Sequence, residues 1–197
     1  MTELTAQTVY FGQTGPTNTD RTLELVQERA RALGITTVLV ATTSGATGLK
    51  AAQLLGDLNV VAVTHSAGFS TAYKANHDPG ICDGIRAAGG QVLTTTHAFG
   101  GLGRAVRKKL ATYQVDEIIA YTLRCFGQGM KVVAEITLMA SDGGLVPSDA
   151  PIIAVGGSGK GADTAVVIQP THAQTFFDLR FLEIICMPAP GHPGLEG

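Results

Sequence analysis

Two short apolar runs on either side of a helical segment constrain the fold of this 197-residue chain more than any other feature. Residues 36–41 and 60–64 are rich in β-branched side chains, which is typical of buried strands. Residues 47–55 between them carry a helical pattern that stops at Gly56. A strand–helix–strand unit predicts two parallel strands joined by a right-handed crossover. We therefore expect an α/β fold.

The rest of the chain carries further helical and strand patterns. Helical patterns occupy residues 17–33, 81–88, 103–113, 117–126 and 130–141, and strand patterns occupy 91–95, 152–155, 164–169 and 181–187. A glycine-rich turn joins the strands at 152–155 and 164–169, which favours an antiparallel hairpin. Because no linker or internal repeat interrupts the pattern, we expect one domain over residues 1–197, with an irregular tail at 188–197.

Composition excludes several classes of partner. The formal net charge is −2, so the electrostatic footprint of a nucleic-acid-binding protein is absent. No apolar run reaches the ~18 residues of a membrane span. Charged residues make up only 15% of the chain, which favours apolar surface covered by another subunit and hence a homo-oligomer. The basic cluster formed by Arg104, Arg107, Lys108 and Lys109 is typical of a solvated helix face.

Cysteine and histidine usage gives no sign of a metal or a disulfide framework. The three cysteines lie far apart and form no C-x-x-C motif. No pair of His, Asp or Glu has the helical spacing of metal ligands, so we predict no metal site. Residues 1–8 lack the basic and apolar regions of a signal peptide. We therefore expect a reduced, cytoplasmic protein.

The turn after the first strand of the unit has the chemistry of a phosphate site. A helix start presents backbone N–H groups and partial positive charge, which favour anions. Hydroxyl groups gather at the same place, and a glycine lets the backbone approach a ligand. The phosphate-binding candidates are Thr42, Thr43, Ser44, Gly45 and Thr47. The alternative is that these hydroxyls serve only as helix N-caps.

Other polar residues follow strands that are expected to end at the same edge of the sheet, where α/β proteins bind ligands. The possible rim contacts are His65, His97, Gly157, Ser158 and Lys160. Each histidine could titrate near neutral pH or could be an ordinary neutral loop residue. Lys160 could reach the ligand or pair with Asp163. In residues 130–141, Lys131 and Glu135 lie one helical turn apart and are expected to pair.

These motifs resemble the C-terminal domain of pyruvate kinase. The order strand, hydroxyl–glycine turn, helix and strand over residues 38–50 and 59–64 is similar to that domain, and so is the preceding helix at 18–33. Residues 123–129 and 162–165 resemble a stand-alone microbial and archaeal family of such domains. The resemblance implies a three-layer α/β/α sandwich whose mostly parallel sheet has an antiparallel edge strand.

The resemblance also implies a ligand. In some full-length kinases the matching turn holds the phosphate of a sugar-phosphate activator. Kinase chemistry does not carry over, because it belongs to a barrel of typically ~250 residues. Flavin mononucleotide (FMN) is a possible cofactor by family association, with its ring system near Phe99 or Phe126.

Two functions remain open from the sequence. One is a binding or regulatory domain for a nucleotide, FMN or a sugar phosphate, without pyruvate kinase activity. The other is a small flavin-dependent or phosphometabolite enzyme that uses the rim histidines.

Overall fold

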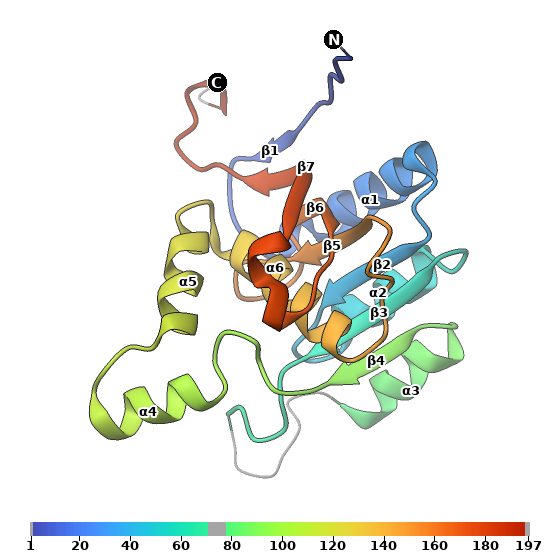
Figure 1. Cartoon of the computed structure of the whole chain (residues 1–197). Coiled ribbons are helices and arrows are strands. Elements are labelled where there is room, and N and C mark those ends of the chain that lie inside the picture. The colour runs from blue at the N-terminus through green and yellow to red at the C-terminus, as the bar shows by residue number, and fades with distance from the viewer. Residues whose placement is uncertain (1, 71–77, 196–197) are drawn as a thin grey trace.

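The computed structural model describes residues 2–70 and 78–195 and places them in a three-layer α/β/α sandwich (Figure 1). The strands are β1 (Val9–Phe11), β2 (Thr37–Ala41), β3 (Asn59–Thr64), β4 (Gln91–Thr94), β5 (Ile152–Gly156), β6 (Thr164–Gln169) and β7 (Arg180–Pro188). The helices are α1 (Thr19–Leu33), α2 (Ala46–Leu54), α3 (Pro79–Ala87), α4 (Leu102–Leu110), α5 (Val115–Arg124) and α6 (Gln128–Asp142). Short 3₁₀ turns lie at Pro16–Asn18, Ala173–Asp178 and Pro193–Leu195.

The central strands are buried on both faces, as expected for parallel strands covered by helices. In β2, Val38 and Val40 face the core under α1, α2 and α3, whereas Leu39 faces the core under α6. All three side chains are fully buried. This alternation follows the two-residue period of a strand and fixes which helices cover which face. The predicted crossover is confirmed, because β2 and β3 pair in parallel from Thr37↔Asn59 onward.

The strand order is β1-β7-β6-β5-β2-β3-β4, and the predicted sandwich with a mostly parallel sheet is confirmed. Strand β6 supplies the antiparallel pairing, because it runs opposite to both β5 and β7. The predicted hairpin of β5 and β6 is also present. Beyond β6, strands β7 and β1 complete this side of the sheet.

Two features near the chain ends differ from expectation. Strand β1 was not predicted, because three residues are too few to show a period, and its partner β7 lies almost the whole sequence away. The tail predicted at 188–197 starts within the sheet, since Pro188 pairs with Phe11, and then turns at Pro193–Leu195. Residues 196 and 197 of that tail lie outside the described residues.

Candidate functional site

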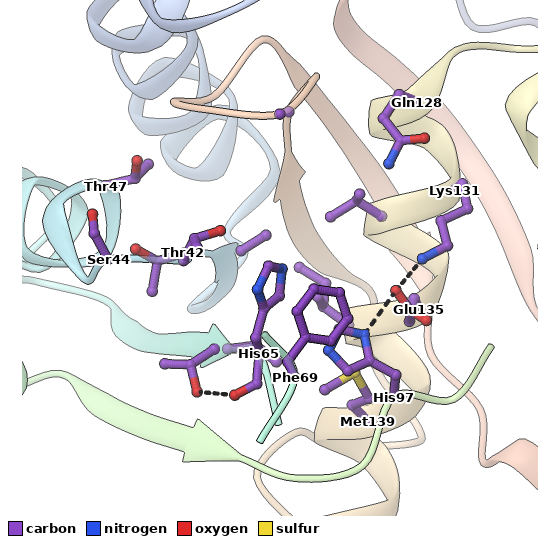
Figure 2. Close-up of a pocket in the computed structure, with 18 of the residues that line it drawn as sticks. Thr42, Ser44, Thr47, His65, Phe69, His97, Gln128, Lys131, Glu135 and Met139 are labelled. Atoms are coloured by element: carbon purple, nitrogen blue, oxygen red, sulfur yellow. Dashed lines mark hydrogen bonds and ion pairs between the residues drawn. The ribbon is translucent and has the colours of Figure 1, made fainter. Parts of the chain in front are cut away.

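A cavity of about 330 Å³ lies at the carboxyl ends of β2 and β3, between the start of α2 and the first half of α6. Figure 2 shows Thr42, Ser44 and Thr47 on one wall, and Gln128 and Lys131 on the opposite wall. Most of the predicted site residues therefore line one cavity: Thr42, Thr43, Ser44, Thr47, His65, His97 and Gly157. Gly45, Ser158 and Lys160 do not line it.

The hydroxyl side chains before and at the start of α2 form one side of the cavity, which we call the α2 wall. Some of them cap the helix, and some are exposed. Thr42 Oγ1 accepts a hydrogen bond from the Gly48 N–H at 3.3 Å, and Ser44 Oγ accepts one from the Ala46 N–H at 3.4 Å. These two hydroxyls therefore act as helix caps, which was the alternative interpretation of the motif. Thr43 and Ser44 are nevertheless exposed, and a hydroxyl that accepts from an amide still has its own O–H to donate. The wall can cap the helix and bind an anion.

Gly45 contributes through its backbone. It is the N-cap of α2 at φ 98°, a conformation that L side chains rarely adopt. A Cβ atom at this position would also lie 2.5 Å from Ile81 Cγ2. Gly45 therefore allows the tight backbone turn that leads from Ser44 into α2.

Three aromatic rings form the base of the cavity between its two walls (Figure 2). The ring of Phe69 lies 4.2 Å from that of His65 and 4.9 Å from that of His97, measured between centroids. Burial, and then the neighbouring His97, lower the pKa of His65 below its ordinary value of 6.5. His65 is therefore mainly neutral at pH 7, and its ring contributes a polar edge without positive charge. Phe69 was not identified from the sequence.

A buried ionic cluster on α6 forms the lower part of the opposite wall. Lys131 Nζ donates to Glu135 Oε2, which confirms the predicted pair. Glu135 also accepts the Phe99 N–H at 3.1 Å and lies 3.4 Å from His97 Nδ1. His97 Nε2 accepts the Ser66 N–H at 3.4 Å, which favours the tautomer with its proton on Nδ1, toward the carboxylate.

The cluster has a defined charge state. Burial raises the pKa of Glu135, but the contact with His97 and the charge of Lys131 outweigh burial and hold that pKa at about 2. Burial lowers the pKa of the Lys131 ammonium, and Glu135 opposes this change. At neutral pH the carboxylate is ionised.

Two arginines add positive charge that sequence reasoning did not assign to the site. Arg104 of α4 lines the cavity and places its guanidinium 4.7 Å from the centre of the Phe69 ring. The interpretation of the basic cluster as a solvated helix face is therefore wrong for Arg104. It also fails for Arg107, which pairs with the buried Glu117 at 2.7 Å. Arg124, the last residue of α5, lines the cavity and donates through Nε to Gln128 Oε1 at 2.8 Å.

The turn between β5 and β6 closes the cavity with Gly157, Gly159 and Gly161. Asp163 anchors this turn and is fully buried. Its Oδ2 accepts the Gly15 N–H at 2.9 Å and the Ser158 N–H at 3.1 Å, and its Oδ1 accepts the Thr164 hydroxyl at 2.9 Å. Asp163 thus binds backbone amides and a neighbouring hydroxyl, and Lys160 is exposed.

Neither of the two aromatic residues expected near a flavin lines the polar cavity. Phe99 is buried and lines a second, more apolar cavity of about 580 Å³ together with Leu102, Val115 and Phe176. Phe126 is 61% exposed and lines neither cavity. Among the described residues that line the polar cavity, Phe69 is the phenylalanine.

Over residues 2–70 and 78–195, no group of three or more His, Cys, Asp or Glu side chains is placed to hold a metal ion. Within the same residues, every helix is too short or too polar to cross a bilayer.

Comparison with known proteins finds one protein family and several solved structures. The family described as "Pyruvate kinase, alpha/beta domain" matches residues 20–168. Among solved structures, Cryptosporidium parvum pyruvate kinase in complex with ADP is similar at 15% identity and a TM-score of 0.40, over 77% of this chain and 23% of that one. Another structure of Cryptosporidium parvum pyruvate kinase gives 14% identity and a TM-score of 0.35, over 74% and 21%.

A weaker similarity involves O-ureido-L-serine synthase, at 21% identity and a TM-score of 0.30, over 48% of this chain and 30% of that one. The chain thus spans between about a fifth and a third of the length of these proteins. The family match covers most of the sequence and includes both walls of the cavity. The chain belongs to the pyruvate kinase alpha/beta domain family.

Proposed function

We propose that this domain binds a phosphate-bearing small molecule in the cavity between α2 and α6. The observation that carries the proposal is the meeting of the hydroxyl-rich start of α2 with three cationic side chains, Arg104, Arg124 and Lys131. Glu135 is the one carboxylate among the described residues that line the cavity. The three cations and Glu135 together contribute a formal charge of +2, which complements the −1.5 to −2 charge of a phosphomonoester at pH 7.

The size of the cavity supports a compact ligand. Small-molecule sites are typically about 300–1,000 Å³, and this cavity lies at the lower end of that range. A sugar phosphate or another small phosphorylated metabolite fits this size better than a dinucleotide does.

We further propose that the domain acts by binding or regulation, without pyruvate kinase activity. The chain spans only 21–23% of the chains in the two pyruvate kinase structures compared above. The matched family is the alpha/beta domain of pyruvate kinase, whereas the resemblance described above assigns kinase chemistry to a separate barrel domain. Binding alone requires no more than the cavity.

FMN remains a specific candidate among the phosphate-bearing ligands. Its phosphate would contact the α2 turn, and its ring system would lie against His65 and Phe69, in place of the position expected near Phe99 or Phe126. Purified protein that is yellow and shows flavin absorbance bands would support FMN, and colourless protein that takes up no added FMN would exclude it.

The test is a thermal-shift titration with inorganic phosphate, glucose 6-phosphate, AMP and FMN. A ligand present at 100 times its dissociation constant stabilises the fold by about 2.7 kcal/mol. The double variant Thr43→Ala, Ser44→Ala should lose most of this stabilisation, because both side chains are exposed on the cavity wall. Thr112→Ala, an exposed threonine away from the cavity, is the matched control. The proposal fails if no compound shifts the melting temperature.

The ionic cluster favours a second candidate, an enzyme acting on a phosphorylated compound. His97 and Glu135 form a buried imidazole–carboxylate pair at the edge of the cavity, an arrangement used in acid–base catalysis. Turnover of a phosphorylated compound that is lost in His97→Gln, with ligand affinity retained, would support this function. Turnover that is unchanged in the variant would exclude a role for the pair.

A further inference from the structure

We propose that α4 and the groove beside it form a self-association surface, in which α4 of one copy packs antiparallel against α4 of a second copy across a two-fold axis. The groove is the second, more apolar cavity of about 580 Å³, which is lined by residues of α4, α5 and the turn at Ala173–Asp178. The composition favours a homo-oligomer, and we assign to it this surface and this orientation.

Helix α4 is an amphipathic helix that a single copy leaves largely uncovered. None of its residues is buried. The helix lies at the outer edge of the molecule and packs against α5 (Figure 1). Its apolar residues Leu102, Val106 and Leu110 are four positions apart and therefore form one stripe along the helix. Because a short helix without tertiary packing is only marginally stable in water, this stripe favours a partner.

The groove continues the stripe of α4 into the body of the domain. Leu102 and Val106 line the groove, together with Val115 of α5 and Phe177. Val115 and Phe177 are 73% and 84% exposed, so the rim of the groove is apolar and open. The lining also includes the buried Leu138 of α6. A side chain that enters the groove therefore reaches the hydrophobic core.

The exposed apolar area of this surface is close to what a stable dimer needs. Leu102, Leu110, Val115, Ile118 and Phe177 are each 56–87% exposed. At this exposure, five such side chains present about 300–550 Å² of apolar surface. A standard interface buries about 800 Å² on each partner, of which a little more than half is apolar. These side chains thus supply most of the apolar area of one such interface.

The charges on this surface favour a second copy over an unrelated protein. Among the described residues, no ion pair involves Asp116, Lys108 or Lys109. Asp116 lines the groove, and its carboxylate lies against Gly103 in the first turn of α4. The two lysines lie in the last turn of α4. The surface therefore carries an unpaired anion at one end of α4 and unpaired cations at the other.

Antiparallel packing of α4 across a two-fold axis satisfies both the apolar stripe and the charges. In such an interface, residue i of one copy contacts residue j of the other, and j contacts i. With Val106 near the axis, Leu110 of each copy meets Leu102 of the partner subunit. Lys109 of each copy then lies near Asp116 of the partner subunit, so the same ion pair forms twice. A second copy thus matches this surface in shape and in charge.

The test is sedimentation velocity of the full chain from micromolar to near-millimolar concentrations, where we expect a dimer. Leu110→Ser removes an apolar contact that occurs twice, and Lys109→Glu and Asp116→Lys each bring like charges together twice. Each variant should weaken the dimer by at least about ten-fold. Leu33→Ser at the end of α1, 41% exposed, and Arg86→Glu, an exposed cation of α3, are the matched controls and should leave the dissociation constant within about two-fold. Circular dichroism checks that every variant is folded.

A mixture of Lys109→Glu and Asp116→Lys distinguishes a contact between copies from an effect within one copy. In the mixed dimer, the new carboxylate of one variant faces the new ammonium group of the other. At the symmetry-related contact, the unmodified Lys109 and Asp116 face each other. An equimolar mixture should therefore dimerise within about three-fold of the unmodified chain, although each variant alone dimerises weakly.

Three results would overturn the proposal. A chain that stays monomeric at near-millimolar concentration, or that forms a trimer, excludes the two-fold dimer. A dimer that Leu110→Ser and Lys109→Glu leave unchanged is formed through another surface. A mixture that associates no more tightly than its two separate variants excludes the antiparallel orientation.

Discussion

Replacing Asp163 by alanine should strongly destabilise the domain, because this carboxylate holds the β5–β6 turn together and ties it to the distant Gly15. It is fully buried and accepts from the Gly15 N–H, the Ser158 N–H and the Thr164 hydroxyl. A buried donor without a partner costs about 1–3 kcal/mol, and more when the lost acceptor was charged. Gly15 and Thr164 are buried, whereas Ser158 is half-buried and can bind water.

We therefore expect Asp163→Ala to lower the free energy of unfolding by about 3–5 kcal/mol, a large part of the 5–15 kcal/mol typical of a domain. Urea denaturation followed by circular dichroism at pH 7 measures this change. Asp163→Asn keeps one acceptor oxygen and should lose about half as much. Asp149→Ala, at an exposed position, should stay within about 0.5 kcal/mol of the unmodified protein. A loss below about 1 kcal/mol in Asp163→Ala would refute the anchoring role.

Three further predictions concern acid stability, packing and assembly. The pKa of Glu135 is about 2 in the fold against 4.5 ordinarily, so the unfolded chain takes up the proton first and the free energy of unfolding should fall as the pH drops from 4.5 toward 2. Between pH 5 and pH 3, urea denaturation should show a smaller fall in the free energy of unfolding for Glu135→Gln than for the control Glu28→Gln. Equal falls in the two variants would contradict the role assigned to Glu135. Gly129→Ala would place a Cβ atom 2.0 Å from a β6 hydroxyl and should destabilise by at least about 1–3 kcal/mol in thermal melts, unlike Gly12→Ala, whose surroundings are open. The exposed apolar side chains of α4 and α5 lead us to expect a homo-oligomer in light scattering, weakened by Val115→Asp; a monomeric unmodified protein would contradict this expectation.

The fold was largely predictable because its signals are local. The helix over residues 17–33 appears as α1 at Thr19–Leu33 and ends at Gly34 with φ 66°, as the glycine indicated. The parallel unit of β2, α2 and β3 follows from two apolar runs at the right spacing. Strand β1 could not be found in this way, because its position depends on pairing with β7 and not on its own three residues.

The site was predictable on one wall only. The α2 turn has a sequence signature, since hydroxyls and a glycine follow a strand and precede a helix. The α6 wall has no such motif: Lys131 and Glu135 look like an ordinary helix pair, and Arg124 belongs to a different helix. A signal was nevertheless present, because charged residues within an otherwise apolar, buried helix require partners, and those partners cluster in space.

The pairing of β1 with β7 has a consequence for folding. Val9 lies beside Cys186 in the sheet, so two segments that are far apart in the sequence must meet before this edge of the sheet can form. Until then β7 lacks its hydrogen-bonding partner on this side, and the segment around Val9 stays unpaired. We expect closure of this edge to be a late and comparatively slow event in folding, since contacts between distant parts of a chain form slowly.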